Sequence, residues 1–164
     1  MLRNFLNFLL PNKADAPVRW VNRDLAIGCL VDESDWLALR VRGVRGVVDL
    51  NNEAADLGPI VRRHGMRYLR LPVADGQMPE LEELHIVTSW ALQRVCEEGP
   101  VLVHEGSARG NHALVAAAAL VKRGASVSRA GGQLRHAGAA PFNDGQLDLL
   151  VRFAGEMMQA AGRR

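Results

Sequence analysis

The stretch Val-Leu-Val-His-Glu-Gly-Ser-Ala-Arg-Gly-Asn-His at positions 101–112 decides the fold of this chain. Its first three residues are apolar and mostly β-branched, which predicts a short central strand. A loop of small residues follows, and the alanine-rich segment 111–123 predicts a helix directly behind it. A strand that turns through glycines into a helix presents backbone N–H groups at the helix N-terminus, where an anion such as phosphate can bind. The same composition also fits a strand-to-helix connection that binds nothing.

Predicted strands and helices alternate on both sides of this stretch. Short apolar runs predict strands, and periodic apolar positions bounded by Gly and Pro predict helices. Such an alternation predicts an α/β fold, a three-layer sandwich with a short, mainly parallel central sheet flanked by helices. The segments concerned are, in chain order, 25–28, 34–43, 44–50, 53–64, 68–71, 79–98, 126–135 and 143–160.

The size and composition indicate one globular domain. The chain has 164 residues, of which 48% are hydrophobic and 23% charged. Its net charge of +2 is too small to favour nucleic-acid binding, and no run approaches the roughly 18 apolar residues of a membrane span. Cys29 and Cys96 are too few for a disulfide scaffold and lack metal-site spacing, which indicates a reducing, cytoplasmic location. We expect no metal and no cofactor.

The N-terminal segment has a pattern of its own. The spacing i, i+3, i+4, i+7 predicts an amphipathic helix over residues 1–12, followed by a single domain over 13–164. We expect this helix to pack on its own domain, with a peripheral membrane or partner contact as the alternative. The apolar residues that would make either contact are Leu2, Phe5, Leu6 and Leu9.

Residues 101–112 resemble the active-site strand, loop and helix of the dual-specificity branch of the cysteine-dependent protein tyrosine phosphatases. The loop of that family reads Val-His-Cys-x-x-Gly-x-x-Arg-Ser/Thr. The resemblance covers residues 22–158 in order, with 65–76 similar to the general-acid loop and 143–146 similar to the closing segment. It implies a dual-specificity phosphatase-like fold. It also implies an anion-binding loop made of Glu105, Gly106, Ser107, Ala108, Arg109, Gly110, Asn111 and His112.

The chain departs from the family at the positions that carry the chemistry. Glu105 stands in place of the nucleophilic cysteine, and Asn111 in place of the arginine that clamps phosphate. Ala108 replaces a glycine, and His112 replaces the hydroxyl residue that helps the thiolate leave. Asp75 matches the general acid, although an ordinary Asp-Gly turn explains it equally well. The resemblance therefore implies a degenerate member of the family, a pseudophosphatase.

A carboxylate is a poor replacement for the thiolate. It would repel a phosphate dianion, and an acyl phosphate would need cationic stabilisation that the loop no longer supplies. We expect instead that Glu105 can enter the loop, accept its N–H groups and act as a built-in phosphate mimic. We expect no catalytic residue here, Asp75, Glu105 and Asn111 being positional equivalents.

The remaining polar residues have mainly structural interpretations. Arg109 matches an outward-facing family position and is expected in solvent rather than as a new clamp. His104 matches the family histidine that supports the loop. His112 lies at i+8 from His104, so the HExxH metal motif is absent. Cys29 and Cys96 are expected to be structural, with Cys96 on the core-facing side of its helix.

Three functions follow from this pattern. The first is a phosphatase-like protein without catalytic activity that binds a protein partner or a phosphorylated ligand. The second is a hydrolase of phosphoesters with altered, non-thiol chemistry. The third, ranked last, is an ordinary phosphatase. The second function would use Asp75, Glu105, Arg109 and His112.

Overall fold

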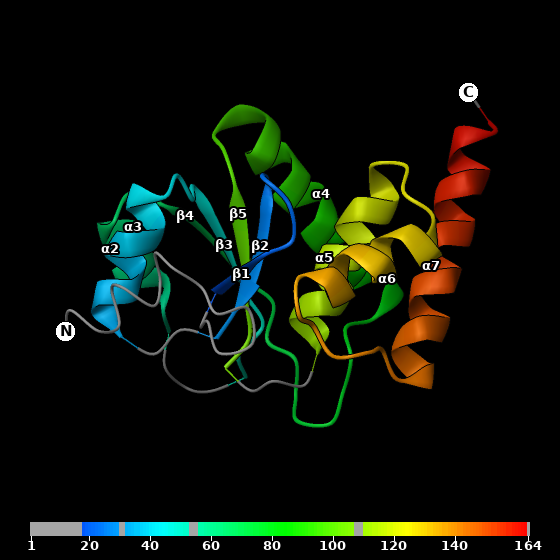
Figure 1. Ribbon diagram of the computed structural model, residues 1–164, viewed down its shortest axis with the longest axis horizontal. Helices are drawn as coiled ribbons and strands as arrows, with labels where there is room; N and C mark the ends of the chain where they lie inside the picture. Colours follow the sequence, from blue (N-terminus) through cyan, green and yellow to red (C-terminus); the bar gives the residue numbers. More distant parts are fainter. Residues whose placement is uncertain (1–17, 30–31, 53–55, 107–109, 164) are drawn as a thin grey trace.

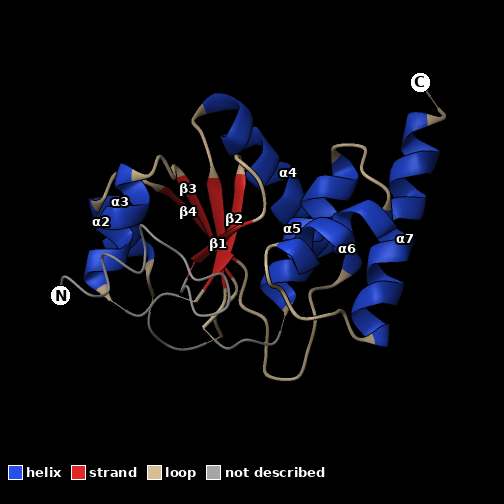
Figure 2. Cartoon of the chain, viewed as in Figure 1, coloured by secondary structure: helices blue, strands red, loops and turns tan. Residues whose placement is uncertain are grey.

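The structure is a computed structural model that describes residues 18–29, 32–52, 56–106 and 110–163. The described chain forms three layers, with α2 and α3 on one face of a central sheet and α4 to α7 on the other (Figures 1 and 2). This confirms the three-layer α/β fold. The helices are α2 (Glu33–Val41), α3 (Gly58–Arg63), α4 (Leu81–Glu97), α5 (Asn111–Lys122), α6 (Val127–His136) and α7 (Asp144–Ala161).

The sheet has five strands in the order β1-β2-β5-β3-β4. Neighbouring strands are parallel except for β1, which runs antiparallel to β2. The predicted central strand, β5, lies in the middle of the sheet, so the carboxyl ends of β2, β5 and β3 meet at one edge. The strands are β1 (Val18–Trp20), β2 (Leu25–Gly28), β3 (Gly46–Asp49), β4 (Arg67–Arg70) and β5 (Val101–His104).

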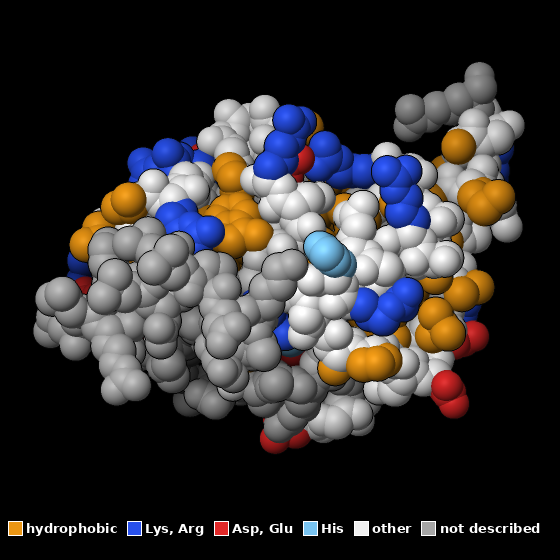
Figure 3. Space-filling model, in the orientation of Figure 1, with side chains coloured by type: hydrophobic (Ala, Val, Ile, Leu, Met, Phe, Trp, Pro, Cys, Tyr) orange, Lys and Arg blue, Asp and Glu red, His pale blue; other side chains and the backbone are white. Residues whose placement is uncertain are grey.

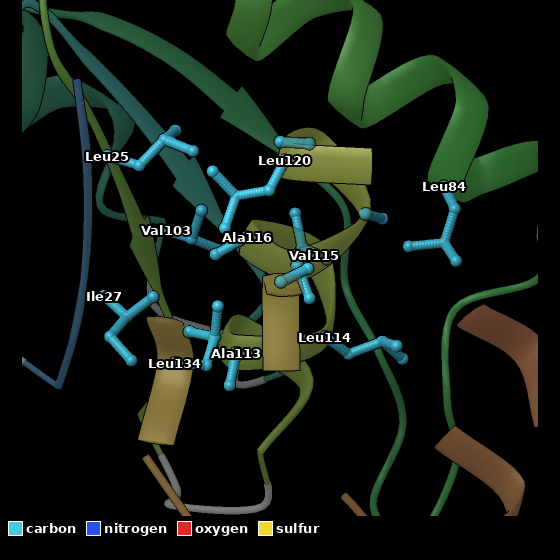
Figure 4. Packing of buried hydrophobic residues seen from close by; sticks show 14 of the residues in the cluster. Leu25, Ile27, Leu84, Val103, Ala113, Leu114, Val115, Ala116, Leu120 and Leu134 are labelled. Atoms are coloured by element: carbon cyan, nitrogen blue, oxygen red, sulfur yellow. The ribbon is translucent and has the colours of Figure 1, made fainter. Parts of the chain in front are cut away.

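Two hydrophobic cores hold the layers together. The smaller one joins α2 to the sheet through Trp36 and Leu39, which are buried against Val47 of β3. The larger one surrounds α5, which is buried from Asn111 to Val121 (Figure 4). Five of the twelve residues of this helix are alanine, so neighbouring elements can approach it closely while it packs against α4, α6 and α7. The tight packing fixes the N-terminus of α5, where the candidate site lies.

The structure corrects two predictions. Cys96 is exposed rather than core-facing, because the buried face of α4 runs through Leu84, Val87 and Ala91 and the helical repeat turns position 96 away from it. The helix expected over 53–64 begins at Gly58, whose N–H donates to the Asp56 carboxylate at 2.8 Å. Pro59 in the first turn is consistent with this later start.

Two further segments complete the comparison with the sequence. Strand β1 is a short element that the apolar pattern does not predict, since its middle residue is Arg19. The predicted N-terminal helix, with Leu2, Phe5, Leu6 and Leu9, lies outside the described residues. Among the residues that the structure describes, no helix combines the length and apolarity needed to cross a membrane.

Candidate functional site

The candidate site lies where β5 ends and α5 begins. Gly110 precedes α5 with φ of +85°, a left-handed conformation that favours glycine. Position 106 also needs a glycine, because a Cβ there would overlap the side-chain amide of Asn51. Positions 107–109, and with them Ser107, Ala108 and Arg109, lie outside the described residues. The site is therefore described from Glu105, Gly106 and the first turn of α5.

Glu105 points into the protein and binds the N-terminus of α5. The residue is 4% exposed, and its Oε2 accepts the backbone N–H of His112 at 3.2 Å. The same oxygen lies 2.7 Å from Nδ1 of the His112 ring. An ionised carboxylate accepts hydrogen bonds but cannot donate one, so the proton of this contact is on Nδ1. The N-terminus of α5, whose N–H groups favour negative charge, thus receives the chain's own carboxylate.

Asn111, at the family's arginine position, is engaged in a structural contact. It is 3% exposed, and its Nδ2 donates to the carbonyl oxygen of Gln77 at 3.1 Å. Its Oδ1 lies 3.5 Å from Nε2 of Gln146 in α7. The side chain therefore links the loop that carries Asp75 to the first turn of α7. A short neutral amide used in this way offers no bidentate cation to a phosphate group.

A buried polar network lies beneath the loop. Nδ1 of His104 is 3.1 Å from the Asp49 carboxylate at the end of β3, and the Tyr68 hydroxyl donates to the same carboxylate at 2.7 Å. Asn51 lies 3.3 Å from Nδ1 of His104 through its Nδ2 and accepts the N–H of Gly106 through its Oδ1. Asn51 thus links the loop to Asp49, whose carboxylate accepts the backbone N–H of Asn51 at 3.1 Å.

The charge on Asp49 determines the protonation of this network. Burial alone would raise the pKa of Asp49, but hydrogen bonds from His104, Tyr68 and the backbone of Asn51 outweigh it and lower that pKa. Burial and the neighbouring carboxylate raise the pKa of Tyr68, so its hydroxyl remains a donor. The network is a fixed support for the loop.

Cys29 is the nearest thiol to the altered loop. It follows β2, and the N–H of Glu105 donates to the carbonyl of the preceding residue, Gly28, at 3.1 Å. Burial and the negative charge of Glu105 raise the pKa of Cys29, against a smaller lowering by Arg19. A reactive thiolate needs the opposite environment. The environment of Cys29 therefore favours the neutral thiol.

Asp75 lies in the loop between β4 and α4. It is exposed, in a turn that contains Gly76 with φ of +74° and closes through the Gln77 N–H and the Ala74 carbonyl at 3.0 Å. The structure anchors its loop at Gln77, through Asn111. Within the described residues, no group of three or more His, Cys, Asp or Glu side chains could hold a metal ion.

Four polar residues of this site were absent from the sequence interpretation. Asp49 and Asn51 follow the buried run of β3, and parallel strands bring their carboxyl ends to one edge, which is the signal that could have found them. Tyr68 and Gln146 come from β4 and α7, and no local pattern marks either one. The residues are Asp49, Asn51, Tyr68 and Gln146.

The sheet order, the loop after β5 and the buried start of α5 define a phosphatase-like fold of the dual-specificity class. Among solved structures, PTPMT1 in complex with PI(5)P has a TM-score of 0.81 at 23% identity, covering 88% of this chain and 99% of that one. A mouse dual-specificity phosphatase complexed with zinc tungstate has a TM-score of 0.78 at 25% identity, covering 90% and 92%. The expected fold is thereby confirmed.

A family profile identifies the chain more closely. The profile described as "Polymorphic toxin system, DSP-PTPase phosphatase" matches residues 29–125, more than half of the chain. The protein belongs to this family, as the resemblance of residues 101–112 predicts. A comparison with curated proteins finds no match.

Proposed function

We propose that this protein is a pseudophosphatase, a member of the dual-specificity phosphatase family that binds a partner or a phosphorylated ligand without hydrolysing it. The observation that carries the proposal is the position of Glu105. Its buried carboxylate accepts an N–H of α5 at the site where the family binds phosphate. A phosphate dianion would have to displace this carboxylate or bind beside it against charge repulsion.

The other altered positions support the same proposal. The Asn111 amide is hydrogen-bonded to Gln77 and Gln146. The position where the family has an arginine therefore holds no cation that could stabilise a transferring phosphoryl group. The environment of Cys29 favours the neutral thiol. Both the nucleophile and the clamp are lost from a scaffold that otherwise keeps its fold.

We further propose that the protein works in a reducing compartment such as the cytoplasm and that residues 13–164 form one domain. The absence of a cysteine pair with disulfide or metal-site spacing in the sequence supports the first point. The family match and the coverage of whole solved domains support the second. Because PTPMT1 was solved with PI(5)P, a phosphorylated ligand stays within the proposal.

A second function has one specific observation in its favour. Nε2 of His112 is buried and has no hydrogen-bond partner among the described residues. With Glu105 bound to Nδ1, the ring is oriented as in a carboxylate-supported general base. A hydrolase with non-thiol chemistry would use this pair, with Asp75 and Arg109 in supporting roles.

The proposal is tested by combining turnover with phosphate binding. We expect the unmodified chain to hydrolyse no aryl phosphate and to gain less thermal stability from inorganic phosphate than a variant without the Glu105 carboxylate. Glu105→Gln removes the carboxylate's charge and should permit phosphate to raise the melting temperature. Glu82→Gln, a charge-matched change on the exposed side of α4, should leave the phosphate response unchanged.

Each contrary result has a clear meaning. Turnover by the unmodified chain that disappears in His112→Gln would replace the pseudophosphatase with the second function. Phosphate stabilisation of the unmodified chain equal to that of Glu105→Gln would show that Glu105 leaves the loop open. The double variant Glu105→Cys, Asn111→Arg tests the scaffold, and its failure to turn over substrate while well folded would remove the general-acid assignment of Asp75.

A further inference from the structure

A second feature with binding chemistry lies at the opposite end of the sheet from the candidate loop. A cavity of about 620 Å³ wraps around the edge of β4, with Arg62 of α3 on one side and Trp90 and Arg94 of α4 on the other. Arg67, the first residue of β4, and Glu98, which follows α4, also line it. We call this cavity the arginine groove. It lies at the amino end of β4, whereas the loop follows the carboxyl end of β5.

The groove holds a carboxylate between two guanidinium groups. Both Glu98 oxygens lie 3.1 Å from Nε of Arg67, and Oε1 lies 2.6 Å from Nη1 of Arg94. Arg94 also contacts Glu97 at 2.6 Å, yet its buried Nε has no partner among the described residues. The Arg67 side chain is 65% exposed. With Arg62 included, three arginines lie beside two carboxylates, Glu97 and Glu98, so the groove retains positive charge and, at Arg62 and Arg67, donors for further carboxylates.

The start of β4, Arg67 and Tyr68, forms the floor of the groove, and β4 is the edge strand of the described sheet. Strand β4 is the last strand of the sheet and pairs with β3 alone among the described strands. In a parallel strand, alternate residues direct their N–H and C=O groups away from the paired neighbour, and an extended peptide can add to such an edge. Arginines beside the edge discourage pairing with a second copy of this basic strand.

We propose that the arginine groove binds an acidic segment of a partner protein in extended conformation, added as a strand along β4. The carboxylates of that segment would contact Arg62, Arg67 and Arg94, in the manner that Glu98 already contacts two of them. The main-chain groups of the segment would pair with the outer edge of β4. This site is separate from the candidate loop, and its occupation does not depend on whether the loop binds phosphate.

The surroundings of the aromatic rings favour a peptide over a single-stranded nucleic acid. Bases bind such grooves by stacking on free aromatic faces. The Arg62 guanidinium already covers the Tyr68 ring at 5.3 Å, and the Tyr68 hydroxyl is bound to Asp49. Trp90 is half-buried and packs beside Gly46 of β3. The arginines are thus better placed than the rings to contact a ligand. Figure 3 shows Lys and Arg side chains along the upper rim of the molecule, the side that carries the α4–β5 connection in Figure 1.

The test uses the full chain and a labelled peptide of alternating Glu and Val. Fluorescence anisotropy should show saturable binding that weakens with salt, since ion pairs at an exposed groove are screened. Arg67→Glu should weaken binding about tenfold or more, because it reverses a charge that the peptide contacts. Arg152→Glu, the same change at an exposed position of α7, should alter binding by less than about twofold. Thermal melting checks that each variant is folded. If Arg67→Glu does not fold, Arg67→Ala is used in its place.

Two further ligands distinguish the occupant. The same peptide with Pro at alternate positions keeps its charge but cannot pair as a strand, and it should bind much more weakly. An oligothymidylate of equal charge should also bind more weakly. The proposal is overturned by absence of saturable peptide binding, by equal losses in Arg67→Glu and Arg152→Glu, by undiminished binding of the Pro peptide, or by tighter binding of the oligothymidylate.

Discussion

The two ends of the sheet differ in whether their charged side chains are buried and paired or exposed to solvent. At the carboxyl end, Glu105 and Asp49 are buried and bound to histidines of the same chain. At the amino end, Arg67 is mostly exposed and lines a cavity with two other arginines. The charges at the carboxyl end are therefore paired within the chain, while the amino end keeps a cation available. Removal of one charge should have very different effects at the two ends.

The largest effect is expected for Asp49→Ala. This change leaves His104 and the Tyr68 hydroxyl without their buried acceptor. Breaking a buried pair by removing one partner costs about 3–5 kcal/mol, so the free energy of unfolding should fall by about that amount. Urea unfolding followed by circular dichroism measures the loss.

The matched control is a carboxylate at the amino end of the sheet. Asp24 contacts Arg123 at 2.7 Å, with 42% of the Arg123 side chain exposed. Since partly exposed pairs contribute little, Asp24→Ala should cost about 1 kcal/mol or less. Equal losses in the two variants would contradict the contrast between the ends.

The second prediction concerns the pH dependence of the same carboxylate. The pKa of Asp49 is lowered in the folded chain, so its contribution to stability is complete above the ordinary pKa of about 4 and is lost as the pH falls through the folded pKa. Urea unfolding between pH 5 and pH 2 should show a decline in stability that is smaller in Asp49→Asn, which has no carboxyl group to titrate at this position. An identical decline in the two proteins would mean that other carboxyl groups account for the acid sensitivity.

The sequence predicts the scaffold of this site better than its contacts. The run 101–104 and the alanine-rich helix are local patterns, and they correctly predict the central strand and α5. The contact of Asn111 with Gln146 joins residues 35 positions apart, and that of Tyr68 with Asp49 depends on which strands are neighbours. No local period encodes such pairings. The sequence misplaces Cys96 because position 96 does not lie on the helical face that Leu84, Val87 and Ala91 share, although its neighbour Val95 packs against the core.

A third prediction tests whether Glu105 suppresses thiol chemistry nearby. The charge of Glu105 adds to burial in raising the pKa of Cys29, so Glu105→Gln should lower that pKa and increase the thiolate fraction. In a Cys96→Ser background, which removes the exposed thiol, iodoacetamide should alkylate Cys29 roughly two- to fivefold faster at pH 8. Glu82→Gln in that background should leave the rate unchanged. A slower reaction in Glu105→Gln would show that the carboxylate does not act on the thiol through its charge.

The smallest effect on stability is expected at the arginine groove. Glu98→Gln removes the carboxylate between Arg67 and Arg94, but the Glu98 side chain is 27% exposed and Arg67 is largely in solvent. Unfolding should therefore change by less than about 1 kcal/mol. The same substitution frees two guanidinium groups, so affinity for the acidic peptide should rise about twofold to tenfold. Anisotropy and urea unfolding on the same preparation separate the two effects. Unchanged peptide affinity would mean that Glu98 does not compete with the peptide for the arginines. Weaker peptide binding would mean that Glu98 holds the arginines in position, because removing a competitor raises affinity whereas removing a positioning group lowers it.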